Sequence, residues 1–162
     1  MEINHLMKNM LQKYNILDRI EEIVLEPRLA SLLSKGIIEF DRCYFLHALL
    51  PIGFDVREAE QSSFDRTDLE CTVNHIHIGD FIEGDKKNKK VLIEQGACYA
   101  YSLQSLLPET EEFSIILAFT FDPIIDCNVR FHMQRPGERW LAKDLEKYEE
   151  ALLVLRKSLH EL

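Results

Sequence analysis

The chain has 162 residues, 46% of them apolar, and a formal net charge of −9. We expect one domain over residues 1–162, because a chain of this length can form a single hydrophobic core. The acidity argues against direct contact with nucleic acid, since few cations are present to replace the counterions of the phosphates. The sequence has neither a stretch of about 18 apolar residues nor a secretory leader, so we expect a cytoplasmic protein without a membrane span.

The N-terminal region is predicted to be helical. Apolar residues recur at helical spacing over residues 3–17, and the pattern continues over residues 20–24. Pro27 interrupts this pattern and suits the first turn of a second, short helix. Gly36 is expected to end that helix.

The middle of the chain is predicted to turn to strands. Residues 42–50 form an apolar run that fits a strand, although a buried helical turn fits nearly as well. Residues 56–66 are polar and are expected to form a loop. Residues 69–78 are rich in β-branched side chains and end at a Gly-Asp turn, which predicts a strand.

The clearest patterns lie in the second half of the chain. An apolar stripe predicts a helix over residues 91–107, which Pro108 ends. Alternation of apolar and polar residues predicts strands over 113–121 and 127–134, and the short link between them predicts antiparallel neighbours. Leucines and a tyrosine at spacings of four and three predict an amphipathic helix over residues 141–159.

Together these predictions indicate an α+β fold. An antiparallel sheet of about four or more strands would pack with N-terminal, middle and C-terminal helices. One face of the strand over residues 127–134 would be polar, because Asn128, Arg130, His132 and Gln134 alternate with apolar residues. We expect this face to be open to water or to a partner.

The net charge comes from two acidic stretches. Residues 55–70 contain Asp55, Glu58, Glu60, Asp65, Asp68 and Glu70. Residues 107–126 contain Glu109, Glu111, Glu112, Asp122 and Asp126. Two smaller groups are basic: Lys86, Lys87, Lys89 and Lys90, and Arg130, Arg135, Arg139 and Lys143. Each group by itself fits a solvated loop, but the acid concentrated in two stretches is also typical of a surface that attracts a basic partner.

Histidines and cysteines are the residues that could carry chemistry. His75 and His77 would share one face of a strand and could bind zinc if His132, His47 or a carboxylate supplied a third ligand. Zinc needs three or four ligands, so two half-exposed histidines without metal are the expected outcome, and no cofactor is expected. Four widely spaced cysteines follow no metal-binding pattern and are expected to be buried thiols: Cys43, Cys71, Cys98 and Cys127.

Four stretches resemble the small immunity proteins of bacterial contact-dependent growth inhibition and related polymorphic toxin systems: TVNHIHIGDF, FSIILAFTF, CNVRFHMQRPGERWL and YEEALLVL. The resemblance covers about residues 40–155. It implies an acidic, cytosolic, single-domain protein without enzymatic activity. Such a protein binds the C-terminal toxin domain, often a nuclease, that a neighbouring cell delivers.

The resemblance and the charge pattern agree, because a nuclease is usually basic and acidic residues would speed its capture. We therefore expect the acidic residues of both stretches to bind a basic toxin domain, with further contacts from Arg130, His132 and Trp140. Trp140 could instead pack beneath the C-terminal helix. Two alternatives are a small enzyme that uses His75, His77 and His132, with or without zinc, and a homo-oligomeric regulatory or adaptor domain assembled through the C-terminal helix. The chain could be a monomer or a homodimer.

Overall fold

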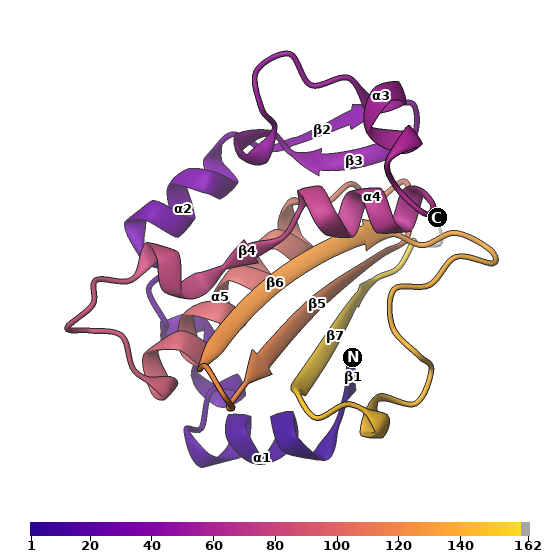
Figure 1. The fold of residues 1–162 in the computed structure, drawn as a ribbon. Coiled ribbons are helices and arrows are strands. Elements are labelled where there is room, and N and C mark those ends of the chain that lie inside the picture. The colour runs from indigo at the N-terminus through magenta and orange to yellow at the C-terminus, as the bar shows by residue number, and fades with distance from the viewer. Residues whose placement is uncertain (160–162) are drawn as a thin grey trace.

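A computed structural model describes residues 1–159 and has an α+β fold (Figure 1). Its centre is a five-stranded sheet in the order β1-β7-β5-β6-β4, and every neighbouring pair is antiparallel. The fold class inferred from the sequence is confirmed. The strands are β1 (Glu2–Ile3), β4 (Ile76–His77), β5 (Phe113–Thr120), β6 (Asp126–Met133) and β7 (Ala151–Lys157).

The predicted strands over residues 113–121 and 127–134 are confirmed as β5 and β6, which pair from Phe113 opposite Met133 to Thr120 opposite Asp126. Alternate residues of both strands, with those of β7, form the inner face of the sheet and are buried in the main core. Helix α5 (Lys89–Leu106) lies behind this face in Figure 1 and confirms the middle helix.

Helix α5 approaches the sheet closely at Gly96. A Cβ atom at this position would lie 2.6 Å from Cys127 Sγ and 2.8 Å from Leu117 Cδ1. Both distances are shorter than van der Waals contact. The absence of a side chain at Gly96 therefore allows the helix to pack directly on β5 and β6.

The N-terminal region contains helix α1 (His5–Lys13), a 3-10 helix, η1 (Leu17–Glu22), and helix α2 (Pro27–Ser34). Pro27 begins α2 as predicted. The predicted helix over residues 3–17 is shorter than expected. Asn4 caps α1 and Asn15 has a φ of 49°, a left-handed conformation that interrupts a helix.

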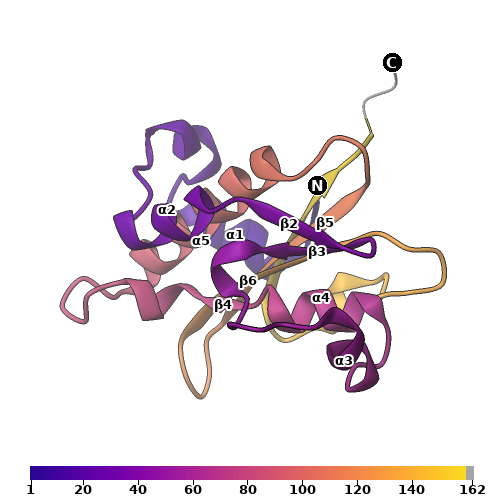
Figure 2. The same cartoon turned by 90° about the horizontal axis from the view of Figure 1, so that it is seen from above.

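A hairpin of β2 (Ile37–Phe40) and β3 (Cys43–Leu46) follows, and η2 (His47–Leu49) continues it. The strand predicted over residues 42–50 is confirmed for β3 but was too long, and β2 was missed. Asp41 and Arg42 form the turn with φ values of 50° and 61°, as a two-residue hairpin turn requires. Figure 2 shows this hairpin from above, lying across one end of the sheet.

The prediction for residues 56–78 was wrong in most of its length. The expected loop contains α3 (Val56–Gln61), and the expected strand is replaced by α4 (Arg66–Val73), the two-residue strand β4 and the 3-10 helix η3 (Ile78–Phe81). Asp55 and Asp65 cap the two helices through their carboxylates. An aspartate before each segment is the signal that favoured helices.

Helix α4 covers the edge of β6 that the short β4 leaves unpaired. Glu70 Oε2 accepts a hydrogen bond from the N–H of Met133, and Asn74 Nδ2 donates to the carbonyl of Phe131. On the other side of the helix, Glu70 accepts from the N–H of Tyr44, and Asn74 accepts from the N–H of Leu46. Glu70 in α4 and its C-cap residue Asn74, which lie on one side of the helix, therefore connect β3 to β6.

The predicted C-terminal helix over residues 141–159 was also wrong. Residues 134–150 form a long loop that contains η4 (Leu145–Lys147), and the chain ends in β7 between β1 and β5. Leu152 and Leu155, assigned to one helical stripe, face opposite sides of the sheet. The run Ala151–Leu155 is wholly buried, and a strand covered on both faces has no alternation that would distinguish it from a helix.

Candidate functional site

The loop over residues 134–150 folds back across the outer face of the sheet. Trp140, Leu141 and Tyr148 pack against a small cluster that includes Ile116 and Val154. The polar face expected to be open is thus partly covered by the chain itself: Asn128 is 9% exposed and His132 is 7% exposed. This covering corrects the prediction that the face is wet or free for a partner.

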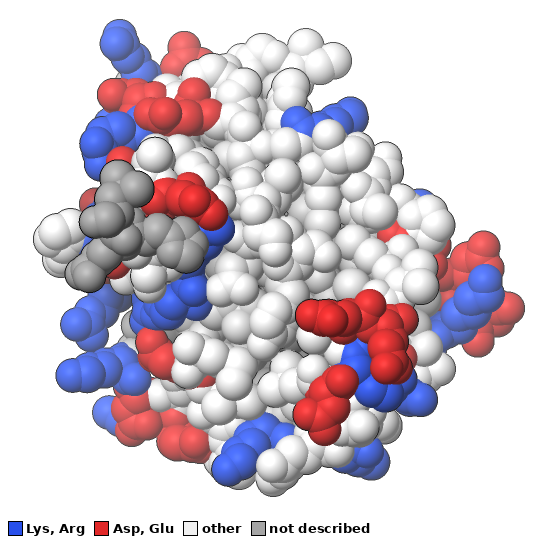
Figure 3. Space-filling model, turned by 180° about the vertical axis from the view of Figure 1, so that it is seen from behind, with Lys and Arg blue, Asp and Glu red and all other residues white. Residues whose placement is uncertain are grey.

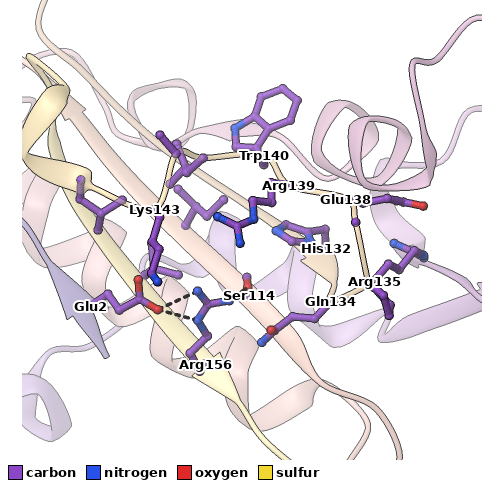
Figure 4. Close-up of a pocket in the computed structure, with 17 residues that line it drawn as sticks. Glu2, Ser114, His132, Gln134, Arg135, Glu138, Arg139, Trp140, Lys143 and Arg156 are labelled. Atoms are coloured by element: carbon purple, nitrogen blue, oxygen red, sulfur yellow. Dashed lines mark hydrogen bonds and ion pairs between the residues drawn. The ribbon is translucent and has the colours of Figure 1, made fainter.

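A cavity of about 560 Å³ lies between this loop and the sheet (Figure 4). Apolar side chains of the loop and the sheet line part of it. Its charged lining residues are four cations and two carboxylates: Arg135, Arg139, Lys143, Arg156, Glu2 and Glu138. In a chain with a net charge of −9, the cavity is therefore a locally basic region.

The floor of the cavity is a set of polar side chains held by the sheet. Arg156 donates to Glu2 Oε1 from Nε and Nη2, and its Nη1 donates to the Ser114 hydroxyl at 2.6 Å. The Nδ1 atom of His132 lies 2.8 Å from the carbonyl of Met133. Because a carbonyl only accepts, Nδ1 carries the proton, and the Nε2 atom of the neutral ring is an acceptor.

Burial lowers the pKa of His132, and the positive charges of Arg135 and Arg156 lower it further. The histidine is therefore neutral at pH 7. Within residues 1–159, its Nε2 atom has no hydrogen-bond partner. The ring lines the cavity, where Nε2 can meet a ligand.

Two interactions hold the beginning of the loop in place. Arg135 is paired with the fully buried Glu70, with Nη1 to Oε2 and Nη2 to Oε1 distances of 2.8 Å. Glu138 Oε2 accepts a hydrogen bond from the backbone N–H of Thr67, the second residue of α4. Burial raises the pKa of Glu70, whereas the Arg135 guanidinium and two backbone N–H groups oppose that increase.

Arg139 and Lys143 are the two cations of the cavity that have no carboxylate partner within the described part of the chain. Figure 4 shows Arg139 extending from the loop toward His132 and Lys143 extending toward Glu2 and Arg156. Sequence reasoning noted these basic residues but treated them as a solvated group. Their convergence depends on the fold of the loop, which the predicted C-terminal helix did not allow.

Arg130 lies beside the cavity, and its guanidinium already contacts two other side chains of the protein. Its guanidinium carbon lies 4.7 Å from the centre of the Trp140 ring, and its Nη2 lies 3.0 Å from Nε2 of His75. Arginine only donates, so His75 accepts and is neutral. Burial lowers the pKa of His75 to about 4, and the Arg130 charge acts in the same direction. Trp140 therefore packs on the sheet, although not beneath a C-terminal helix.

The two histidines considered for a metal lie side by side, but each is hydrogen-bonded to another side chain. The centres of the His75 and His77 rings are 4.5 Å apart, and His77 Nδ1 lies 2.9 Å from Asp126 Oδ1. No group of three or more potential metal ligands occurs among residues 1–159. The structure does not bring His132 or His47 into a ligand set with this pair.

The acidic stretch 55–70 is only partly a free surface. Asp55 and Asp65 are helix caps, Asp68 accepts from the N–H of Phe64, and Glu60 pairs with Arg66. Glu70 is fully buried, so the expectation that it meets a partner was wrong. Glu58 is exposed and has no ion-pair partner in residues 1–159.

The acidic stretch 107–126 is divided between two ends of the sheet, because β5 runs through its middle. At one end, Glu111 pairs with Arg42 and Glu109 lies 3.7 Å from Lys157, while Glu112 is exposed. Asp122 and Asp126 lie in the β5–β6 hairpin at the other end. The two stretches therefore do not form one acidic surface, and Figure 3 shows acidic and basic groups interleaved around a broad uncharged area on the rear face.

Exposed apolar side chains accompany the acid in two places. Ile52 and Phe64, on either side of α3 in the chain, are essentially fully exposed. Phe121, Ile124 and Ile125 are exposed at the tip of the β5–β6 hairpin. Sequence reasoning missed both groups, although an isoleucine before Gly53 and a phenylalanine within a polar stretch were visible signals.

All four cysteines are buried and free, as expected. Burial raises the pKa of each thiol, to about 11 for Cys43, so none is a thiolate at neutral pH. No helix among residues 1–159 is long and apolar enough to cross a membrane.

Comparison with known proteins identifies one family. The search of curated proteins finds no match, and the search of solved structures finds none either. A sequence profile of the Uncharacterized protein PM0498 family matches residues 2–160. Since the match covers nearly the whole chain, the protein belongs to the Uncharacterized protein PM0498 family.

Proposed function

We propose that the protein is an immunity protein that binds and neutralises a basic toxin domain, and that the surface around α3 makes the contact. The observation that carries this proposal is the exposure of two apolar side chains, Ile52 and Phe64, on either side of α3, the helix that carries the exposed carboxylate of Glu58. Aromatic and aliphatic anchors with charged surroundings are typical of protein interfaces, whereas a solvated loop gains nothing from them.

The backbone around Phe64 supports this role. Asp68 Oδ2 accepts a hydrogen bond from the Phe64 N–H at 2.9 Å, and Asp65 caps the helix that follows. The aromatic ring is thus presented from a well-defined segment, which lowers the entropy lost when a partner binds.

The charge of −9 supports a basic partner. A nuclease toxin binds phosphates and carries cations for that purpose, so a carboxylate surface attracts it at long range and increases the association rate. Residues 51–66 contain Asp55, Glu58, Glu60 and Asp65 against Arg57 and Arg66, of which Arg66 is paired with Glu60. A basic toxin domain therefore complements this surface better than an acidic or neutral partner.

The β5–β6 hairpin tip is a weaker candidate for the same contact. Its Asp126 is bound to His77, and Lys89 lies 5.9 Å from the ring centre of Phe121. The tip thus has a cation above its aromatic residue and one of its two acids already paired. It lies at the end of the sheet opposite α3 in Figure 1 and serves as a control surface.

The test is co-expression with the toxin C-terminal domain encoded directly upstream of the gene. Wild-type protein should restore growth and bind the purified toxin domain. The variants Phe64→Ser and Glu58→Lys should weaken binding, whereas Ile124→Ser at the hairpin should leave it unchanged. Absence of growth rescue by the folded wild-type protein would overturn the proposed function. Equal losses for the α3 and hairpin variants would exclude α3 as the contact.

A further inference from the structure

We propose that the cavity beneath the loop over residues 134–150 binds a small organic anion, a phosphate or carboxylate joined to an apolar group. This site is separate from the α3 surface and independent of the proposed function. The inference is based on unpaired cations and on the unpartnered Nε2 atom of the largely buried His132, which converge on one cavity of about 560 Å³. That volume is typical of sites for small molecules.

The charges of the cavity favour an anion. Glu2 is bound by Arg156, Glu138 accepts from the Thr67 backbone, and Arg135 is neutralised by Glu70. Arg139 and Lys143 remain without a carboxylate inside the described residues. An oxyanion between them would complete the local charge balance. Hydrogen bonds between an oxyanion and charged donors are about twice as strong as those between neutral groups.

The floor of the cavity provides further hydrogen-bonding groups at fixed positions. The Ser114 oxygen accepts from Arg156, so its own hydroxyl proton is available to donate. Ser114 is only 2% exposed and His132 only 7%, which means that the sheet fixes both groups. The free Nε2 atom of His132 can accept a hydrogen bond, for example from the hydroxyl of a singly protonated phosphate. Both groups line the cavity.

The remaining lining determines what the anion is attached to. Ile116, Val154, Leu141 and Leu145 provide an apolar wall, and Trp140 lies at one side. Leu141 and Trp140 are the partly exposed members of this lining, and an aryl or alkyl group would cover them, whereas an inorganic ion would leave them in water. The site therefore fits an organic anion better than a free ion.

The experiment measures binding of three probes by isothermal titration calorimetry at low salt: phenyl phosphate, benzoate and the neutral benzyl alcohol. At least one of the two anions should bind, and benzyl alcohol should bind more weakly than that anion. Binding of phenyl phosphate alone assigns the site to phosphates, and binding of benzoate alone assigns it to carboxylates. Failure of both anions to bind at millimolar concentration overturns the proposal.

Variants locate the binding. The double variant Arg139→Ala with Lys143→Ala should bind the anion at least about tenfold more weakly than the wild type, because two charge-assisted contacts are lost. Both side chains are exposed, and the double variant is expected to fold. Lys147→Ala, in the same loop but outside the cavity, is the matched control and should bind like the wild type. Equal affinity in the double variant, or an equal loss in Lys147→Ala, shows that the cavity is not the site.

Discussion

The buried pair of Glu70 and Arg135 makes the strongest prediction about stability. Replacing Glu70 with Gln keeps the shape of the side chain but removes its charge and one acceptor oxygen. The carboxylate accepts bonds from Arg135 and from the N–H groups of Tyr44 and Met133. In the variant an amide NH₂ must face one of these donors, and Arg135 keeps a buried charge without a counterion.

Removing one partner of a buried ion pair costs about 3–5 kcal/mol. For a chain of this length, each kcal/mol lowers the melting temperature by about 2–4 °C, so we expect a decrease of roughly 6–20 °C. Urea unfolding measures the change in the free energy of unfolding, and thermal unfolding measures the change in melting temperature. Both are followed by circular dichroism and by the fluorescence of Trp140, the single tryptophan.

Two further variants test the reasoning. Glu58→Gln neutralises an exposed carboxylate and should change stability by less than about 0.5 kcal/mol. The double variant Glu70→Gln with Arg135→Met should be less destabilised than the sum of the single variants, because the two side chains interact. A loss below about 1 kcal/mol for Glu70→Gln would refute the view that this pair holds the loop, α4 and the sheet together.

Two other predictions concern the packing of α5 and the pH dependence of stability. Gly96→Ala should destabilise by roughly 1–3 kcal/mol, although alanine favours helices, because its Cβ would overlap Cys127 Sγ. His75→Gln should reduce the loss of stability between pH 6.5 and 4. Over that range the unfolded histidine binds a proton, whereas the folded one, with its pKa lowered to about 4, does not, so acidification favours unfolding. The expected difference is about 1–2 kcal/mol, because the half-buried ring is partly screened by water.

Chemical unfolding checks both predictions. The effect of Gly96→Ala should shrink in a Cys127→Ala background, where the nearest atom is absent. A stabilised Gly96→Ala variant would contradict the close packing of α5. For His75→Gln, unfolding is compared at pH 7 and pH 4.5, and an unchanged difference from the wild type would show that His75 is not protected from protonation.

The α+β class, helix α5 and the β5–β6 pair could be predicted because their signals are local. Residues 113–121 and 127–134 alternate in polarity with the period of a strand, and the link between them is short. The net negative charge of the chain and the exposure of Glu58 were likewise predictable from local composition. The basic cavity was not, since three of its cations come from one loop, the fourth, Arg156, comes from β7, and its floor comes from β5, β6 and β7.

The sequence by itself determined the helical periodicity of α5, the strand alternation of β5 and β6, and the net charge of the chain. The tertiary structure decided where that charge lies. Glu70 was assigned to an acidic surface, but a helix places it against Arg135, 65 residues away, in the interior. The run Ala151–Leu155 forms a strand because β5 provides a partner for its backbone and both of its faces are covered. Contacts between residues distant in the sequence have no local pattern, and they created the buried ion pair, the covered sheet face and the cavity.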